Sequence, residues 1–579
     1  MLSAVTVTLI RAGRLARIAA TGPRAGAGAL LYAAVLGLNF VGIWVSIQMI
    51  AWSKAFYDAL EQMNAPMALR QIGLFFALVT LSAVAWLTAD WLRKLLLIQW
   101  RARLTEWSLD LWIGNRAYWL MRPGYGEMPI ENPDQRVAED CRLFVSHLLE
   151  FTLDLISETV ALFSYVAILW SLATFSLSFT VIGLNIEIPH YMVWLAPLYV
   201  AASTIIAHLL GRPLKRQYFD REKVEADFRH ALVQLRDRAD VVAQSGGEAA
   251  ERRRLDHRFT AIRQNWRRVM RAELVQGLFG RPYMQTVLRL PTFFALPAYF
   301  AGAVSLGGLM QLGSAFSNVA TTLSWIIFEY RKLAEFVAVC ERLDGLICAA
   351  RRPAPLPSAP RAIERKMTTD GTLRLNTLRL ATPEGRWLAP VPEITVPHGG
   401  AFLITGASGQ GKTTLLSAIA GLWPWGEGHI ARPAGQFLFL PAGAPVIGDG
   451  LIAAACHPTD PAQLEMPRIR AVLTHLGLGP RLAAGEGERS LAGLSMGERQ
   501  RIGLARAVLN APEWLLMDEA TSALDPAAEA ELLAWLRAEL PDTTLVLVAH
   551  RIPSGLIADH TLRIGPLSPK GHPHDGPTD

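Results

Sequence analysis

Gly406-Ala-Ser-Gly-Gln-Gly411-Lys412-Thr413 follows the short apolar stretch Ala401–Thr405 and precedes a segment with helical periodicity. This spacing of glycines before Lys and Thr is that of a phosphate-binding loop. Backbone N–H groups of such a loop surround phosphate oxygens at the positive end of the following helix, and the lysine reaches the β- and γ-phosphates. We therefore predict an α/β P-loop NTPase domain. Its nucleotide-binding residues are Gly406, Ala407, Ser408, Gly409, Gln410, Gly411, Lys412, Thr413 and Thr414.

Two acids end a second apolar strand, Trp514-Leu-Leu-Met-Asp518-Glu519. Such a strand can end in an ordinary surface turn, but its position after a phosphate loop favours catalysis. Asp518 and the Thr413 hydroxyl are predicted to hold Mg²⁺, and Glu519 to polarise the attacking water. A last strand, Thr544 to Ala549, ends at His550, which we expect to contact the γ-phosphate as a second catalytic residue.

A third motif, Leu494-Ser-Met-Gly-Glu-Arg-Gln500, lies between these two. Ser495 and Gly497 can present a hydroxyl and backbone N–H groups at another helix N-terminus. One ATPase domain already has a phosphate cradle, so a second anion-binding turn suggests that ATP is held between two copies. Glu498 and Asp525 are assigned to the same nucleotide site.

The composition indicates that part of the chain lies in lipid. Of 579 residues, 51% are hydrophobic and 18% are charged, compared with about 25% charged residues in soluble proteins. The length favours two large domains. The net charge of +6 is not accompanied by a dense Lys/Arg run or an aromatic platform, so we expect no nucleic-acid partner.

Six apolar stretches each approach the roughly 20 residues needed to cross a bilayer. We expect a polytopic α-helical membrane domain with six spans, although Pro291 and Pro297 in the fifth leave five spans open. The stretches lie near residues 28–50, 72–98, 156–182, 190–210, 285–304 and 308–328.

The basic residues predict the orientation of these spans. Lys and Arg are concentrated between the second and third spans and between the fourth and fifth, whereas Asn185–Glu187 and residues 304–307 contain none. Both termini are therefore expected in the cytoplasm. The helical charge pattern of the two long connections predicts that membrane helices continue into the cytosol.

His147, Glu150, Asp154 and Glu158 recur every three or four residues and therefore share one helix face. Acidic groups at membrane depth usually face a water-filled interior and often have a function. These residues are our candidates for a substrate path. The alternative is that this part of the helix lies in the cytosol, where the carboxylates are simply solvated.

Changes in composition give the expected domain boundaries. We expect a cytoplasmic leader, a membrane domain, a Pro/Ala/Arg-rich linker, an ATP-binding domain and a disordered tail. These cover residues 1–27, 28–346, 347–367, 368–566 and 567–579.

The order of these motifs identifies a family. Leu494–Glu498 is similar to the ATP-binding-cassette signature, and its place between the phosphate loop and Met517–Asp525 resembles that superfamily. Four further motifs resemble the bacterial relatives of ABC subfamily D, a group that includes YddA-type proteins and the mycobacterial cobalamin transporter. They are residues 132–140, 225–229, 246–252 and 421–424.

The resemblance implies an exporter-type membrane fold with swapped helices, similar to the SbmA/BacA peptide-uptake proteins, in a half-transporter that works as a homodimer. ATP and Mg²⁺ are the implied cofactors. Two positions depart from the family pattern: Ala442 replaces a glutamine that contacts Mg²⁺, and only Trp387 is available to stack on adenine.

Three functions follow from these features. The first is ATP-driven transport across the bacterial inner membrane of a hydrophilic solute, such as a peptide or a cobalamin-like compound. This solute class is what the resemblance implies, together with the acidic stripe. The second is export or flipping of acyl lipids, which a smooth apolar cavity would favour. The third is a regulatory ATP-binding membrane protein with little turnover, which Ala442 favours.

Overall fold

The computed structural model describes residues 2–121, 130, 132–174, 176–181, 184–300, 302–351, 361–483, 491, 493–549 and 555–565. The chain divides into two compact units. The first comprises Met1–Tyr118 and Ile130–Arg352, and the second comprises Trp119–Pro129 and Pro353–Asp579. His550 and the tail from residue 566 onward lie outside the described residues.

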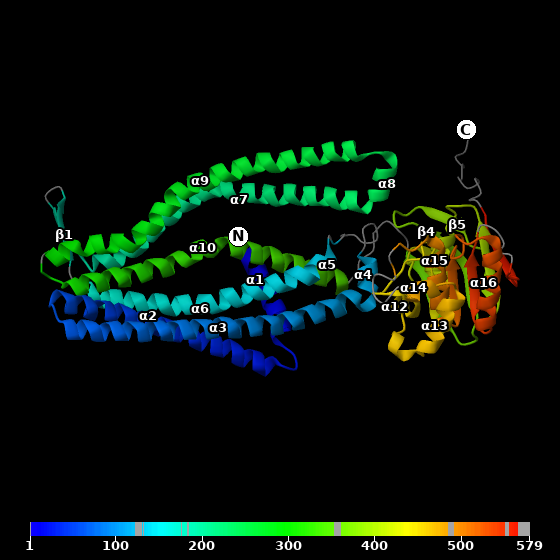
Figure 1. Cartoon of the computed structure of the whole chain (residues 1–579), viewed down its shortest axis with the longest axis horizontal. Coiled ribbons are helices and arrows are strands. Elements are labelled where there is room, and N and C mark those ends of the chain that lie inside the picture. The colour runs from blue at the N-terminus through cyan, green and yellow to red at the C-terminus, as the bar shows by residue number, and fades with distance from the viewer. Residues whose placement is uncertain are drawn as a thin grey trace, which may run out of the picture. The chain divides into compact units, whose positions relative to one another are not determined.

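Long helices make up most of the first unit (Figure 1). They are α1 (Leu2–Ala20), α2 (Ala25–Glu61), α3 (Ala65–Ile113), α6 (Cys141–Leu172), α7 (Tyr191–Asp237), α9 (Glu248–Phe300) and α10 (Leu306–Arg351). Short helical segments connect some of them: η1 (Gly114–Arg116), α4 (Ala117–Leu120), α5 (Pro133–Gln135), η2 (Arg136–Asp140) and α8 (Ala239–Ser245). Helices α7 and α9 run side by side as a hairpin.

Three helical segments of the described residues are long and apolar enough to cross a membrane: Ala25–Glu61, Ala65–Ile113 and Pro133–Leu172. Helix α7 adds a shorter apolar segment, Tyr191–Ile206. The chain therefore has a helical membrane region, and the six-span count stays a prediction.

The predicted span 156–182 is too long at its C-terminal end. Helix α6 ends at Leu172, and an antiparallel hairpin of β1 (Ser176–Val181) and β2 (Leu184–Pro189) follows. The sequence Ser-Leu-Ser-Phe-Thr-Val alternates polar and apolar residues, a period of two that favours a strand. Counting apolar residues alone missed this alternation.

The predicted leader forms an ordered helix. Ala12, Leu15 and Ala19 of α1 are buried in a hydrophobic cluster that also contains residues of α3, α6 and α10. Arg11 forms an ion pair of 3.0 Å with Asp344 of α10, and Arg14 also pairs with Asp344.

The described residues of the second unit form two five-stranded sheets. One is parallel, in the order β12-β7-β11-β10-β9, and the other joins β3, β8, β4, β5 and β6. The strands are β3 (Arg361–Thr368), β4 (Leu373–Ala381), β5 (Trp387–Pro390), β6 (Ile394–Val396), β7 (Ala401–Gly406), β8 (Gly426–Pro433), β9 (Phe437–Leu440), β10 (Trp514–Asp518), β11 (Thr544–Val548) and β12 (His560–Ile564).

Helices α11 (Lys412–Ile419), α12 (Leu451–Cys456), α13 (Met466–His475), α14 (Gly479–Ala483), α15 (Met496–Asn510) and α16 (Pro526–Glu539) complete the unit, with the short turn η3 (Pro461–Gln463). Successive residues of β10 face opposite sides of the parallel sheet. Leu515 and Met517 belong to a cluster with α12, α13, α15 and α16, whereas Trp514 and Leu516 belong to a cluster with α11 and the second sheet. Both faces of the sheet are therefore covered, as parallel sheets require.

The start of α10 lies against the end of α2. Asp58 accepts a hydrogen bond of 3.0 Å from the Gly307 N–H, and Glu61 accepts one of 3.1 Å from the Leu306 N–H. These carboxylates satisfy helix-terminal donors and complement the helix dipole. A Cβ atom on Gly307 would overlap the Lys54 carbonyl oxygen and the Asp58 carboxylate.

The first unit, which contains the membrane helices, is termed the membrane unit. Gly307→Ala should destabilise it by about 1–3 kcal/mol through overpacking. We expect a lower apparent Tm for the purified protein in detergent. Gly73→Ala in α3 is the matched control, because a Cβ there meets nothing within 4 Å. Equal melting temperatures for the two variants would contradict the close approach of α2 and α10.

Candidate functional site

The parallel sheet brings two of the predicted motifs to one edge. Val548 of β11 is paired with Ile404 of β7 on one side and with Asp518 of β10 on the other. The loop that starts at Gly406 and the acids at the end of β10 therefore lie at the same sheet edge. They are two strand spacings apart, about 10 Å.

The phosphate loop needs its glycines for steric reasons. Gly406 has φ of 150°, and a Cβ there would lie 2.6 Å from the Ile564 carbonyl oxygen. Gly411 has φ of 92°, and its Cβ would lie 2.9 Å from Leu388. Only glycine tolerates these angles without strain.

Lys412 places its charge within the loop. The side chain is 6% exposed, and its ammonium donates to the carbonyl oxygens of Gly406 at 2.9 Å and Ala407 at 3.1 Å. Ala407, Ser408 and Gly409 are exposed. The loop thus combines a positive charge with accessible backbone at the N-terminus of α11, an arrangement that suits a polyphosphate.

The two acids after β10 have different environments. Asp518 is 3% exposed, whereas Glu519 is half-buried with φ of 51°. Its N–H donates to the Val548 carbonyl oxygen at 3.0 Å. A positive φ is uncommon for a residue other than glycine and is often found at functional sites.

Gln500 holds this backbone in place, a role that was not predicted from the sequence. It is 2% exposed, and its amide N–H₂ lies 3.3 Å from the Glu519 carbonyl oxygen and 3.2 Å from the Ser522 hydroxyl. Its carbonyl oxygen accepts from the Ala523 N–H at 2.9 Å. Two sequence signals were present: Gln500 ends the motif Leu494–Gln500, and it is a polar residue on the apolar face of α15.

The signature turn is a capping box. The Ser495 hydroxyl accepts from the Glu498 N–H at 3.2 Å, and the Glu498 carboxylate accepts from the Ser495 N–H at 2.8 Å. Arg481 binds the same carboxylate through two nitrogens, at 2.9 and 3.2 Å. The Arg481 guanidinium, together with the Ser495 backbone N–H, lowers the pKa of Glu498 to about 2. Glu498 therefore stays ionised and orders the turn.

The remaining predicted nucleotide residues lie near the ends of helices. Asp525 caps α16 by accepting from the Ala528 N–H at 3.0 Å, and this bond lowers the pKa of its carboxyl. Gly497 lies in the first turn of α15. Within the described chain, no hydrogen bond joins residues 493–498 to residues 406–414.

The structure also shows the surroundings of Ala442 and Trp387, the two positions that depart from the family pattern. Leu440 of β9 pairs with Met517 of β10, so Ala442 follows at the same edge as Asp518. The Ala444 N–H donates to the Pro441 carbonyl oxygen at 3.0 Å and closes a tight turn there. The Arg379 guanidinium lies 4.6 Å from the centre of the Trp387 ring, a cation–π contact.

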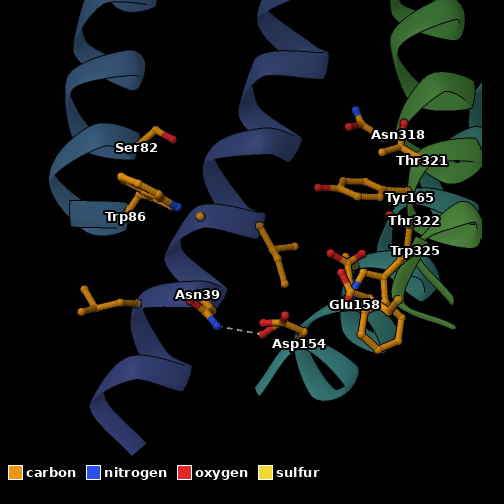
Figure 2. Close-up of a pocket in the computed structure, with 16 residues that line it drawn as sticks. Asn39, Ser82, Trp86, Asp154, Glu158, Tyr165, Asn318, Thr321, Thr322 and Trp325 are labelled. Carbon is orange, nitrogen blue, oxygen red and sulfur yellow. Dashed lines mark hydrogen bonds between the residues drawn. The ribbon is translucent and has the colours of Figure 1, made fainter. Parts of the chain in front are cut away.

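A second candidate site lies in the membrane unit. A cavity of about 620 Å³ lies among α2, α3, α6 and α10 (Figure 2). Asp154 and Glu158 line it together with Glu329, and Trp86, Tyr165 and Trp325 add aromatic rings. Hydroxyl and amide side chains complete much of the lining: Asn39, Ser82, Ser157, Asn318, Thr321 and Thr322.

The other two residues of the predicted stripe do not line this cavity and instead contact α10. His147 is 7% exposed, with Nδ1 3.6 Å from Glu150 and Nε2 3.6 Å from Glu335. Glu150 forms an ion pair with Lys332. The stripe thus divides into two residues at the cavity and two in a charged contact between helices.

Comparison with known proteins gives matches in both halves of the chain. A family model described as ABC transporter transmembrane region 2 matches residues 15–300, and one described as ABC transporter matches residues 392–522. The inner membrane ABC transporter ATP-binding protein YddA of Escherichia coli (strain K12) is 33% identical and aligns over 90% of this chain and 91% of its own length.

Two more distant relatives come from eukaryotes. The chloroplastic ABC transporter D family member 2 of Arabidopsis thaliana is 26% identical over 94% of this chain and 84% of that protein. The human lysosomal cobalamin transporter ABCD4 is 25% identical over 79% of this chain and 78% of that protein.

A substitution at Ala442 tests whether this residue lies beside the predicted catalytic acids at the end of β10. Ala442→Gln adds an amide oxygen beside the acids of β10, and one additional contact in the transition state should raise ATPase activity by up to about tenfold. Ala442→Met is the control, because it has similar length and no amide. Hydrolysis of ATP by both variants decides the point. Equal rates would place residue 442 outside the reacting groups.

Proposed function

This chain belongs to the ATP-binding-cassette transporter family, and we propose that it moves a hydrophilic solute across the bacterial inner membrane. The chain is an ATPase whose hydrolysis is coupled to transport. The observation that carries the choice of solute is the polar lining of the cavity within the membrane unit.

A peptide or a cobalamin-like molecule suits this cavity better than an acyl lipid. Three carboxylates and seven hydroxyl or amide side chains, counting the phenol of Tyr165, line it, and an acyl chain would exclude water from these groups without forming hydrogen bonds with them. Burying polar groups without hydrogen bonds is unfavourable. A hydrophilic solute can satisfy them.

The residues at the edge of the parallel sheet supply the chemistry of hydrolysis. Lys412 would bind the β- and γ-phosphates, and the oxygens of Thr413 and Asp518 suit Mg²⁺. When bound, Mg²⁺ neutralises developing phosphate charge. Glu519 would accept the proton of the attacking water, and we assign His550 to the γ-phosphate.

We infer that two copies form the working transporter. One chain already has a phosphate cradle, so the signature turn, a second anion-binding turn, supports an ATP held between two chains. A stripe on α9 supports a protein partner. It consists of the exposed residues Trp266, Met270, Leu274 and Leu278, which recur every four residues.

Arginines surround this stripe at 263, 267, 268 and 271, and basic groups are costly within the hydrocarbon layer, which favours a protein partner over lipid. A symmetric dimer would cover the stripe with the same chain. We further propose six spans, through α2, α3, α6, α7, α9 and α10, with both termini in the cytoplasm, because the long connections carry the basic residues.

A second function, a regulatory ATP-binding membrane protein with little turnover, is supported by Ala442 alone. It differs from the main proposal in predicting no solute movement. Transport and ATPase measurements on one preparation separate the two.

Purified protein in proteoliposomes should accumulate a solute only with ATP. The assay uses radiolabelled cobalamin and a panel of short hydrophilic peptides, with a labelled acyl lipid for comparison. Glu519→Gln removes the catalytic base and should lower uptake and hydrolysis at least about 100-fold while ATP still binds. Lys412→Ala is a second control, which should weaken ATP binding itself. Movement of the lipid alone, or uptake that these variants do not change, would contradict the proposal.

A further inference from the structure

The charges that line the membrane cavity are of one sign. Asp154, Glu158 and Glu329 contribute carboxylates, and the described lining contains no Lys, Arg or His. The cavity lies among helices of a membrane region, where an uncompensated charge is costly and usually marks a functional site.

Two of these carboxylates have cationic partners from outside the lining. Arg93 lies 3.8 Å from Asp154, and Lys332 lies 3.1 Å from Glu329. Lys332 also pairs with Glu150, so its charge is shared between two acids.

Glu158 differs from the other two. In the described part of the chain it has no basic side chain within ion-pair distance, and its hydrogen-bond partner is the Thr322 side chain. A hydroxyl group is a neutral donor, so among the described residues Glu158 has no counter-ion on the cavity wall.

Aromatic rings lie in the same cavity. Figure 2 shows Tyr165, Trp325 and Glu158 on one side of the cavity and Trp86 on the other. The faces of Trp and Tyr rings attract cations such as ammonium and guanidinium groups. The carboxylate and the aromatic faces are two separate features of the cavity, and both favour a positively charged ligand.

We propose that this cavity binds the cationic group of the transported solute, an ammonium or guanidinium, with Glu158 as its counter-ion. The proposal rests on the transport function and names the solute class as organic cations. A volume of about 620 Å³ is typical of a ligand pocket and accommodates the cationic group together with neighbouring atoms. Asn39, Asn318 and Thr321 also line the cavity, and each already donates a hydrogen bond within the protein. Their side-chain oxygens can still accept from the N–H groups of the solute.

Two peptides that differ at a single amino group test this. One is a blocked tripeptide with a central lysine, and the other contains Nε-acetyl-lysine, which removes the charge. Radiolabelled forms are bound at equilibrium to the full-length protein in nanodiscs. We expect the lysine peptide to bind at least about tenfold more tightly, a difference of about 1.4 kcal/mol. Equal binding of the two peptides to the wild type would overturn the proposal without reference to any variant.

Variants then assign the preference to Glu158. Glu158→Gln should reduce the preference to about twofold or less, and Glu158→Asp, which keeps the charge, should retain most of it. Glu335→Gln is the matched control, because this acid of α10 does not line the cavity. A preference that survives Glu158→Gln would place the cation site elsewhere.

Uptake of both peptides into proteoliposomes separates this inference from the transport function. Binding preference without ATP-driven uptake of either peptide would contradict transport and leave the cation site intact. ATP-driven uptake with no preference for charge would contradict the cation site and leave transport intact.

Discussion

The parallel pairing of β7, β11 and β10 is the constraint on which the ATP site depends. Because Ile404, Val548 and Asp518 are in register, the phosphate loop and the acids of β10 emerge at one edge. A slip of one residue would point every side chain of a strand to the opposite face. The clusters on both faces of the sheet, which include the fully buried Trp514 and Leu515, oppose such a slip and so preserve the site.

Gln500 connects this edge to the signature turn. It lies on α15, one turn beyond the capping box of Ser495 and Glu498, and contacts the backbone of Glu519. A displacement of the first turn of α15 would therefore reach Glu519 through one buried amide. If the signature turn binds the ATP of a second copy, hydrolysis in each chain depends on its partner.

Much of the ATP site could be predicted from the sequence, because Lys412 and Asp518 belong to motifs with local spacing. The partners of Glu519 and Glu498 could not. Gln500 is 19 residues from Glu519, and Arg481 is 17 residues from Glu498, so only the folded chain brings them together. In the membrane half, helical spacing predicted that Asp154 and Glu158 share a face. It could not show which acids of that face meet a cavity and which meet α10.

The central claim is that ATP joins two copies of this chain at their cassettes. A spin label is attached at Glu531→Cys, a position exposed on α16 and outside the predicted ATP site. Pulsed electron paramagnetic resonance then measures the distance between the labels of the two chains. The exposed Cys348 is replaced by serine, and Glu519→Gln prevents turnover. With ATP and Mg²⁺ the distance distribution should shorten and narrow to a single population. A distance distribution that ATP does not change would contradict an ATP-joined dimer. So would the absence of any measurable coupling between two labels.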